Sequence, residues 1–277
     1  TSKEEKVMQL AVDVISKVPE SIDYEMTYKN IGENKSPLDV VLLQEIQRYN
    51  RLLYKIKYSL LDLQKGIQGF VLMSAELEEI FTCIYEGRVP SLWLKAYPSL
   101  KRLGSWTMDL VSRVAHFHSW ANTTHPPVQF WLAAFTFPTG FLTAVLQTSA
   151  RRQEISIDTL SWEFETIPYE AAEKPPDGVY VKSIYLEGAG WHKKNACLIE
   201  PLPMQLVCEM PVIWFRPMEV LKKRTKGFYN CPTYYFPIRA GAPGRPAYIV
   251  AVDLKSGTEN SDYWTKRATA LLLSLAN

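Results

Sequence analysis

The chain has 277 residues, of which 47% are hydrophobic and 22% are charged, which is typical of a globular protein and excludes a disordered or fibrous one. Its 31 lysines and arginines against 29 acidic residues give a net charge of +2, so charge alone does not indicate nucleic-acid binding. Four cysteines, with no Cys-x-x-Cys pair, are too few for a disulfide scaffold and predict reduced thiols instead of a zinc site.

Residues 1–35 predict one short helix followed by a connector. Ser2 and Glu5 have the spacing of a capping box, and apolar residues recur at helical intervals until Pro19 stops the helix. Residues 20–35 are mostly polar, so we expect them to connect this helix to the next one.

A long helix is predicted to begin at Ser36, because a capping serine is followed by a proline and, in the first turn, by Asp39. Apolar residues then recur at alternating steps of four and three, at Leu42, Ile46, Tyr49, Leu53, Ile56, Leu60, Leu63 and Ile67. This continuous apolar seam predicts packing against neighbouring helices of the same chain, with a coiled-coil partner as the alternative. Gly66 and Gly69 suggest where the helix ends.

Two shorter helices follow, one from a Ser74 cap to Gly87 and one with apolar positions from Trp106 to Phe117. A short element at 128–137 then precedes a further helix.

Residues 114–150 carry no Asp, Glu, Lys or Arg, so a membrane span has to be considered. Val128–Leu146 has 19 residues, close to the roughly 20 that a spanning helix needs. Pro138 and Gly140 interrupt it, which favours buried core and a helix near 139–152. An aromatic cluster here predicts core instead of a ligand platform; its members are Phe130, Trp131, Phe135, Phe137 and Phe141.

After residue 156 the pattern changes to a period of two, typical of strands. Leu160, Trp162 and Phe164 alternate with polar residues that include Glu163, which predicts a half-buried strand with Glu163 on the solvent side. Further strands are predicted at Val179–Leu186, Ala196–Ile199, Gln205–Phe215, Thr233–Ile238 and Tyr248–Leu254, with a turn at 175–178. Short strands separated by proline and glycine turns predict an antiparallel sandwich or barrel, and the whole chain is expected to be α+β.

Motifs for chemistry are missing from the sequence. No Gly-x-x-x-x-Gly-Lys-Ser/Thr string is present, and the glycine-rich strings at 188–190 and 241–244 are best explained as turns. His116 and His118 would lie on different faces of a helix, so they are poor metal co-ligands. We therefore predict no catalytic, cofactor-binding or metal residue, although a catalytic triad assembled across the fold stays an alternative.

One basic run, consisting of Lys222, Lys223, Arg224 and Lys226, is a candidate contact for an acidic partner such as tubulin or nucleic acid. The alternative is a solvated loop, which is the commoner role of such a run.

Several strings of residues are more specific than composition or periodicity, and they run in order along nearly the whole sequence. They are Val41–Asn50, Gly87–Trp93, Tyr97–Lys101, Phe130–Leu132, Gly140–Gln147, Ile157–Leu160, Asp177–Val181, Leu186–Trp191, Met210–Trp214 and Tyr229–Pro232. These strings closely resemble the C-terminal region of dynein heavy chains. The Gly190-Trp191 turn and the segment Cys231–Tyr235 are more similar to axonemal than to cytoplasmic dyneins.

Two segments depart from the family pattern. Ala133–Pro138 stands where the family often has Ser-Gly-Phe-Phe-Phe-Pro, and Thr148–Arg152 where it often has Asn-Tyr-Ala-Arg-Lys. These departures concern the choice of isoform and leave the resemblance to the family intact.

The resemblance implies an α+β fold in which an N-terminal helical part is followed by an incomplete antiparallel β-barrel. On this basis residues 36–155 form the helical part and 156–277 the barrel. Residues 1–35 form a short helix and connector that can include the end of the sixth AAA+ module. The parent would be a microtubule motor ATPase that holds ATP and Mg²⁺ in a ring of six such modules, and no ATPase residue can be transferred because none of its motifs occurs here.

The implied function is a regulatory or structural C-terminal domain that docks on the AAA+ ring of the same heavy chain and tunes microtubule-based motility. Microtubules and other dynein subunits would be reached through the parent, in the cytoplasm and cytoskeleton, at the axoneme of a cilium or flagellum. We expect neither nucleic acid nor membrane as a partner, and no enzymatic activity in this fragment. The alternative is a free-standing ligand-binding or enzymatic β-barrel on a helical base, which a deep polar pocket would favour.

Overall fold

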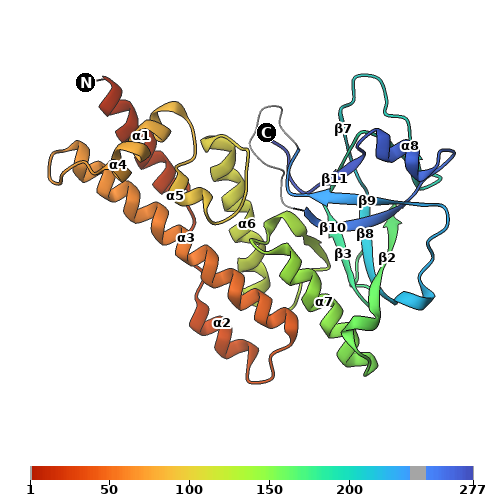
Figure 1. Ribbon diagram of the computed structural model, residues 1–277. Coiled ribbons are helices and arrows are strands. Elements are labelled where there is room, and N and C mark those ends of the chain that lie inside the picture. Colours follow the sequence, from red (N-terminus) through yellow and green to blue (C-terminus); the bar gives the residue numbers. More distant parts are fainter. Residues whose placement is uncertain (1, 238–247, 277) are drawn as a thin grey trace. The chain divides into compact units, whose positions relative to one another are not determined.

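The computed structural model describes residues 2–237 and 248–276, and the protein forms two compact units, which are described separately (Figure 1). The helical unit contains the residues up to 34 together with 42–125, and the strand unit contains 35–41 together with 126–275. Helices therefore come first and sheets second, which confirms the α+β prediction.

The predicted apolar seam organises the helical unit. Its helices are α1 (Ser2–Lys17), α2 (Tyr24–Ile31), α3 (Pro37–Ile67), α4 (Ala75–Glu86), α5 (Ser91–Leu94) and α6 (Leu103–Thr123). Every seam position of α3 from Leu42 to Leu63 is buried. The predicted caps are present, since Ser36 Oγ accepts the Asp39 N–H at 3.1 Å and Gly87 ends α4 with a φ of 72°.

Two short helices were not expected, because neither has an apolar periodicity long enough to predict it. In the predicted connector, Asp23 caps α2 by accepting the Met26 N–H at 3.0 Å, and Thr27 is the buried residue of this helix. The four residues of α5 are held instead by Trp93, whose side chain is fully buried.

The uncharged segment 114–150 is divided among several elements. It contains the end of α6, then β1 (Gln129–Trp131), the 3₁₀ turn η1 (Leu132–Ala134) and most of α7 (Pro138–Gln153). Among the residues that the structure describes, no helix is both long and apolar enough to cross a bilayer.

The aromatic cluster is smaller than predicted. Phe141 packs against Phe130 and Phe135 with ring centroids 4.7 and 4.2 Å apart, and all three side chains are buried. Trp131 is only half-buried and Phe137 is 52% exposed, so the prediction that both are core residues is wrong. The reason is that β1 alternates: Phe130 faces the core, and Trp131 therefore faces away.

The strand unit holds three sheets. Beyond β1 its strands are β2 (Leu160–Ile167), β3 (Val179–Lys182), β4 (Tyr185–Glu187), β5 (Gly190–His192), β6 (Cys197–Ile199), β7 (Val207–Glu209), β8 (Val212–Glu219), β9 (Phe228–Tyr234), β10 (Tyr248–Lys255) and β11 (Ala270–Leu272). The short helices in this part are η2 (Ile157–Thr159), η3 (Val220–Lys222) and α8 (Ser261–Lys266). The sheet orders are β1-β3-β8-β2, β10-β9-β11-β4-β7 and β5-β6, and within the described residues no sheet closes into a barrel.

The strand pairing is mixed, which corrects the prediction of a purely antiparallel arrangement. β1 pairs with β3, and β11 with β9, in parallel, while the other pairs are antiparallel. Parallel neighbours need a long crossover, and α7 with β2 provides one between β1 and β3.

Several predicted strand boundaries also move. The strand expected at 179–186 is divided at Ser183, which has a φ of 61°. The strand expected at 205–215 is divided into β7 and β8. Gly190 belongs to β5, so only Gly188, with a φ of 82°, makes the predicted turn there. Ile238 and the glycine-rich string 241–244 lie outside the described residues.

The turn at 175–178 joins α7 to the first sheet. The Asp177 carboxylate accepts from Ser149 at 3.0 Å and pairs with Arg152 at 2.9 Å, while its carbonyl accepts the Trp214 indole N–H at 2.8 Å. Gly178 is required next to it, because its φ is 71° and a Cβ there would lie 2.0 Å from the Phe215 carbonyl oxygen.

We expect Phe141→Ala to lower the free energy of unfolding by about 3–5 kcal/mol, because it leaves a cavity in the aromatic core. Trp131→Ala should cost less than about 2 kcal/mol, because this ring is half-exposed. Urea unfolding followed by circular dichroism measures both values, and a larger loss for Trp131→Ala would contradict this assignment of the core.

Candidate functional site

The predicted basic run lies between the two larger sheets of the strand unit, in η3 and the loop before β9. Lys223 pairs with Asp253 of β10 at 2.9 Å, and Arg224 pairs with Glu163 of β2, donating from Nε at 2.8 Å and also from Nη2. Because β2 and β10 are edge strands of different sheets, these two ion pairs connect edges that share no backbone ladder in the described part of the protein. We call the pairs Lys223–Asp253 and Arg224–Glu163 the edge clamp.

The other two basic residues are more accessible. Lys222 pairs with Glu219 at 3.2 Å, but its side chain is 68% exposed. Lys226 is exposed and has no ion pair among the described residues. A partner contact by this run stays a prediction, and the structure leaves Lys226 as the residue most available for it.

Glu163 is the acidic centre of the edge clamp, and the prediction of a solvent-facing side chain is wrong. It is 7% exposed and also pairs with Arg216, which stands directly opposite on β8, at 3.3 Å. The Arg216 guanidinium in turn lies 4.6 Å from the Trp214 ring centroid. Two arginines therefore offset the cost of burying one carboxylate, which alternation along β2 could not reveal.

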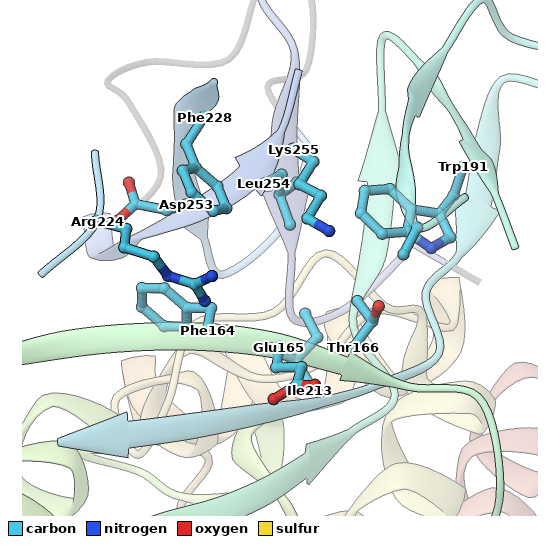
Figure 2. A pocket seen from close by; sticks show the side chains of 11 residues that line it. Phe164, Glu165, Thr166, Trp191, Ile213, Arg224, Phe228, Asp253, Leu254 and Lys255 are labelled. Atoms are coloured by element: carbon cyan, nitrogen blue, oxygen red, sulfur yellow. The ribbon is translucent and has the colours of Figure 1, made fainter. Parts of the chain in front are cut away.

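A cavity of about 240 Å³ opens beside the edge clamp (Figure 2). Side chains from β2, β5, β8, β9 and β10 converge on it: Phe164, Glu165, Thr166, Trp191, Ile213, Phe228, Asp253, Leu254 and Lys255, together with Arg224. Ligand pockets usually measure about 300–1,000 Å³, so this cavity is small for a metabolite or cofactor.

The charged groups of the cavity are partly used by the fold. Asp253 is held by Lys223 and also accepts from Asn230 Nδ2 at 2.8 Å, and Arg224 is held by Glu163. Glu165 and Lys255 are exposed and carry no ion pair among the described residues. The lining contains no histidine and no nucleophile paired with a base, and no group of metal-ligating side chains occurs among the described residues.

The outer mouth of the cavity is basic. An adjoining basin shares Arg224, Phe228 and Lys255 with the cavity and adds Lys226 and Cys197, with no acidic residue in its lining. This arrangement suits a weak contact with an anionic surface better than bond-making chemistry.

The four cysteines are free, as the sequence predicts. Burial raises the pKa of Cys83 to about 11 and that of Cys231 further, so both thiols stay protonated and unreactive at neutral pH. Neither thiol is therefore suited to act as a nucleophile.

We expect Glu163→Gln to lower the free energy of unfolding by about 1–3 kcal/mol, because it leaves two arginines without their shared carboxylate. Glu165→Gln is the matched control on the same strand, and it should stay within about 0.5 kcal/mol of wild type. Chemical denaturation measures both, and equal effects would show that the edge clamp does not stabilise the strand unit.

Comparisons with known proteins agree with the resemblance. The family model for the C-terminal domain of the dynein heavy chain matches residues 1–273. Dynein axonemal heavy chain 2 of Mus musculus is 58% identical over 99% of this sequence. The dynein-1-beta heavy chain of the flagellar inner arm I1 complex of Chlamydomonas reinhardtii is 49% identical over 100% of it.

A third relative, dynein axonemal heavy chain 1 of Rattus norvegicus, is 41% identical over 99% of this sequence. The 277 residues span about 6% of the length of each of these three relatives. Because the family model matches nearly all of its residues, the protein belongs to the family of dynein heavy-chain domains that lie at the C-terminus, among the axonemal heavy chains.

Proposed function

We propose that this protein is the part of an axonemal dynein heavy chain that docks on the AAA+ ring of the same chain and tunes its movement along microtubules. The observation that carries the proposal is the family match over residues 1–273, together with identities of 58% and 49% to axonemal and flagellar heavy chains. The names of these relatives support a place in the axoneme of a cilium or flagellum.

Physical reasoning supports tuning instead of chemistry. A folded body that contacts the ring in one conformation and loses contacts in another changes the free-energy difference between those conformations. A coupling of about 1–3 kcal/mol shifts the equilibrium by roughly 5- to 150-fold. The charged groups that the edge clamp holds together are bound to one another, which fits a structural module.

The finer architecture is part of the same proposal. The facing edges of β2 and β10, connected by side chains, support the description of the strand unit as an incomplete barrel. We also propose that residues 1–35 belong with the sixth AAA+ module, that 36–155 form the helical part, and that 156–277 form the barrel.

The partners and cofactors follow from the parent. Microtubules, other dynein subunits, ATP and Mg²⁺ would be bound by other parts of the heavy chain. In this part, the basic run with Lys226 is the proposed contact of the strand unit with the ring or another partner. Nucleic acid and membranes are not proposed as partners.

We expect the 277-residue protein to bind no nucleotide, because its sequence contains no phosphate-binding loop. Titration with ATP and Mg²⁺ in a calorimeter should give only the heat of dilution. A saturable heat with a micromolar dissociation constant would contradict the proposal that ATP is held elsewhere.

Removing residues 36–277 from the parent heavy chain should change gliding velocity, stall force or run length while ATP hydrolysis persists. This truncation retains residues 1–35, so that a possible part of the sixth module is not removed with the domain. Basal and microtubule-stimulated ATPase rates are measured beside the mechanical quantities. If all of these quantities match wild type, the tuning function is wrong.

A further inference from the structure

We propose that a basic groove on the helical unit binds an acidic helix of the motor ring, an inference that rests on the proposed docking function. The basic groove is formed by Arg48, Arg51 and Lys55 of α3 and by Lys95, which ends α5. Its floor is apolar and consists of Leu52, Leu92 and Ala96.

The position of the groove is fixed by a buried anchor. Trp93 of α5 is fully buried, and its indole N–H donates to Ser59 Oγ of α3 at 3.1 Å. The Trp93 ring also stacks on Trp106 of α6, with centroids 5.8 Å apart. The short α5 is therefore held against α3, and Lys95 is kept beside the cations of the longer helix.

The groove has an excess of positive charge that the described part of the protein leaves uncompensated. Its lining contains four cations and no carboxylate. Arg48 pairs at 3.2 Å with Glu45, whose side chain is fully buried. Arg51, Lys55 and Lys95 make no ion pair with any described residue, and Lys55 is half-buried.

This charge pattern works against the stability of the helix that carries it. Arg51 and Lys55 are four residues apart, and Arg48 and Arg51 are three apart, so all three lie on one side of α3. Like charges at these spacings destabilise a helix, because neighbouring side chains repel each other. A bound anion would relieve this repulsion, whereas an ordinary solvated face usually mixes both signs.

The shape of the groove indicates an acidic helix as the occupant. From Arg48 to Lys55 the cations extend over about 10 Å of helix, which matches carboxylates placed one turn apart on a partner helix. The cavity is shallow, at about 190 Å³, and its apolar floor suits the methylene groups of glutamate side chains. A membrane or a nucleic acid would need a wider basic surface, and the net charge of the protein is only +2.

The test uses the 277-residue protein and a fluorescein-labelled helical peptide with glutamates four residues apart. Fluorescence anisotropy should show binding that weakens as salt increases, and no binding of the same peptide with glutamine for glutamate. The double variant Arg51→Glu/Lys55→Glu should weaken binding at least about tenfold. Lys57→Glu, which makes the same type of charge change on another face of α3, should bind as wild type, and circular dichroism confirms that each variant is folded.

Equal binding by the double variant and wild type would overturn the inference. Tighter binding to phosphatidylserine vesicles or duplex DNA than to the acidic peptide would overturn it as well. The double variant is also introduced into the parent heavy chain, where we expect the mechanical change caused by the truncation. If the truncation changes motility and the double variant does not, the docking function stands and the basic groove is not its contact.

Discussion

The helical unit depends on one buried ion pair. Arg113 of α6 is 1% exposed, and its Nε lies 2.6 Å from Asp109 Oδ2. Its Nη1 donates to the Tyr49 hydroxyl of the apolar seam at 3.3 Å, and its guanidinium carbon lies 3.9 Å from the centre of the Tyr97 ring. Burial raises the pKa of Tyr49, so the phenol stays neutral beside the cation. Removing Asp109 would strand this charge at a cost of about 3–5 kcal/mol, so α3, α6 and the segment after α5 are held in one arrangement.

The strand unit is connected across its open edge by different means. A backbone ladder would join β2 and β10 with hydrogen bonds at most residues, whereas the edge clamp joins them through the side chains of Glu163 and Asp253. An acidic partner that competes for Arg224 would weaken that connection. Partner binding at the basic run and closure of the strand unit are therefore thermodynamically coupled, whatever the partner is.

Local patterns predicted what depends on neighbours in sequence. The seam of α3 was predictable because its period is written within 26 residues, from Leu42 to Ile67. The burial of Glu163 was not, because its partner Arg224 lies 61 residues away and alternation placed the carboxylate in solvent. Trp131 was assigned to the core for its aromatic neighbours, but the pleat of β1 turns it away from Phe130. The parallel pairing of β11 with β9 likewise depends on a crossover through β10 and α8, which has no local signature.

The two basic features show why sequence alone misjudges a charged surface. The basic run at 222–226 is conspicuous in sequence, yet three of its four cations are bound to acids of the same molecule. The cations of the basic groove are scattered between residues 48 and 95, yet α3 and α5 bring them together over an apolar floor. A charge is available to a partner when the fold does not already neutralise it, and that depends on contacts between distant residues. By this criterion the helical unit, through the basic groove, offers the ring a stronger electrostatic contact than the basic run does.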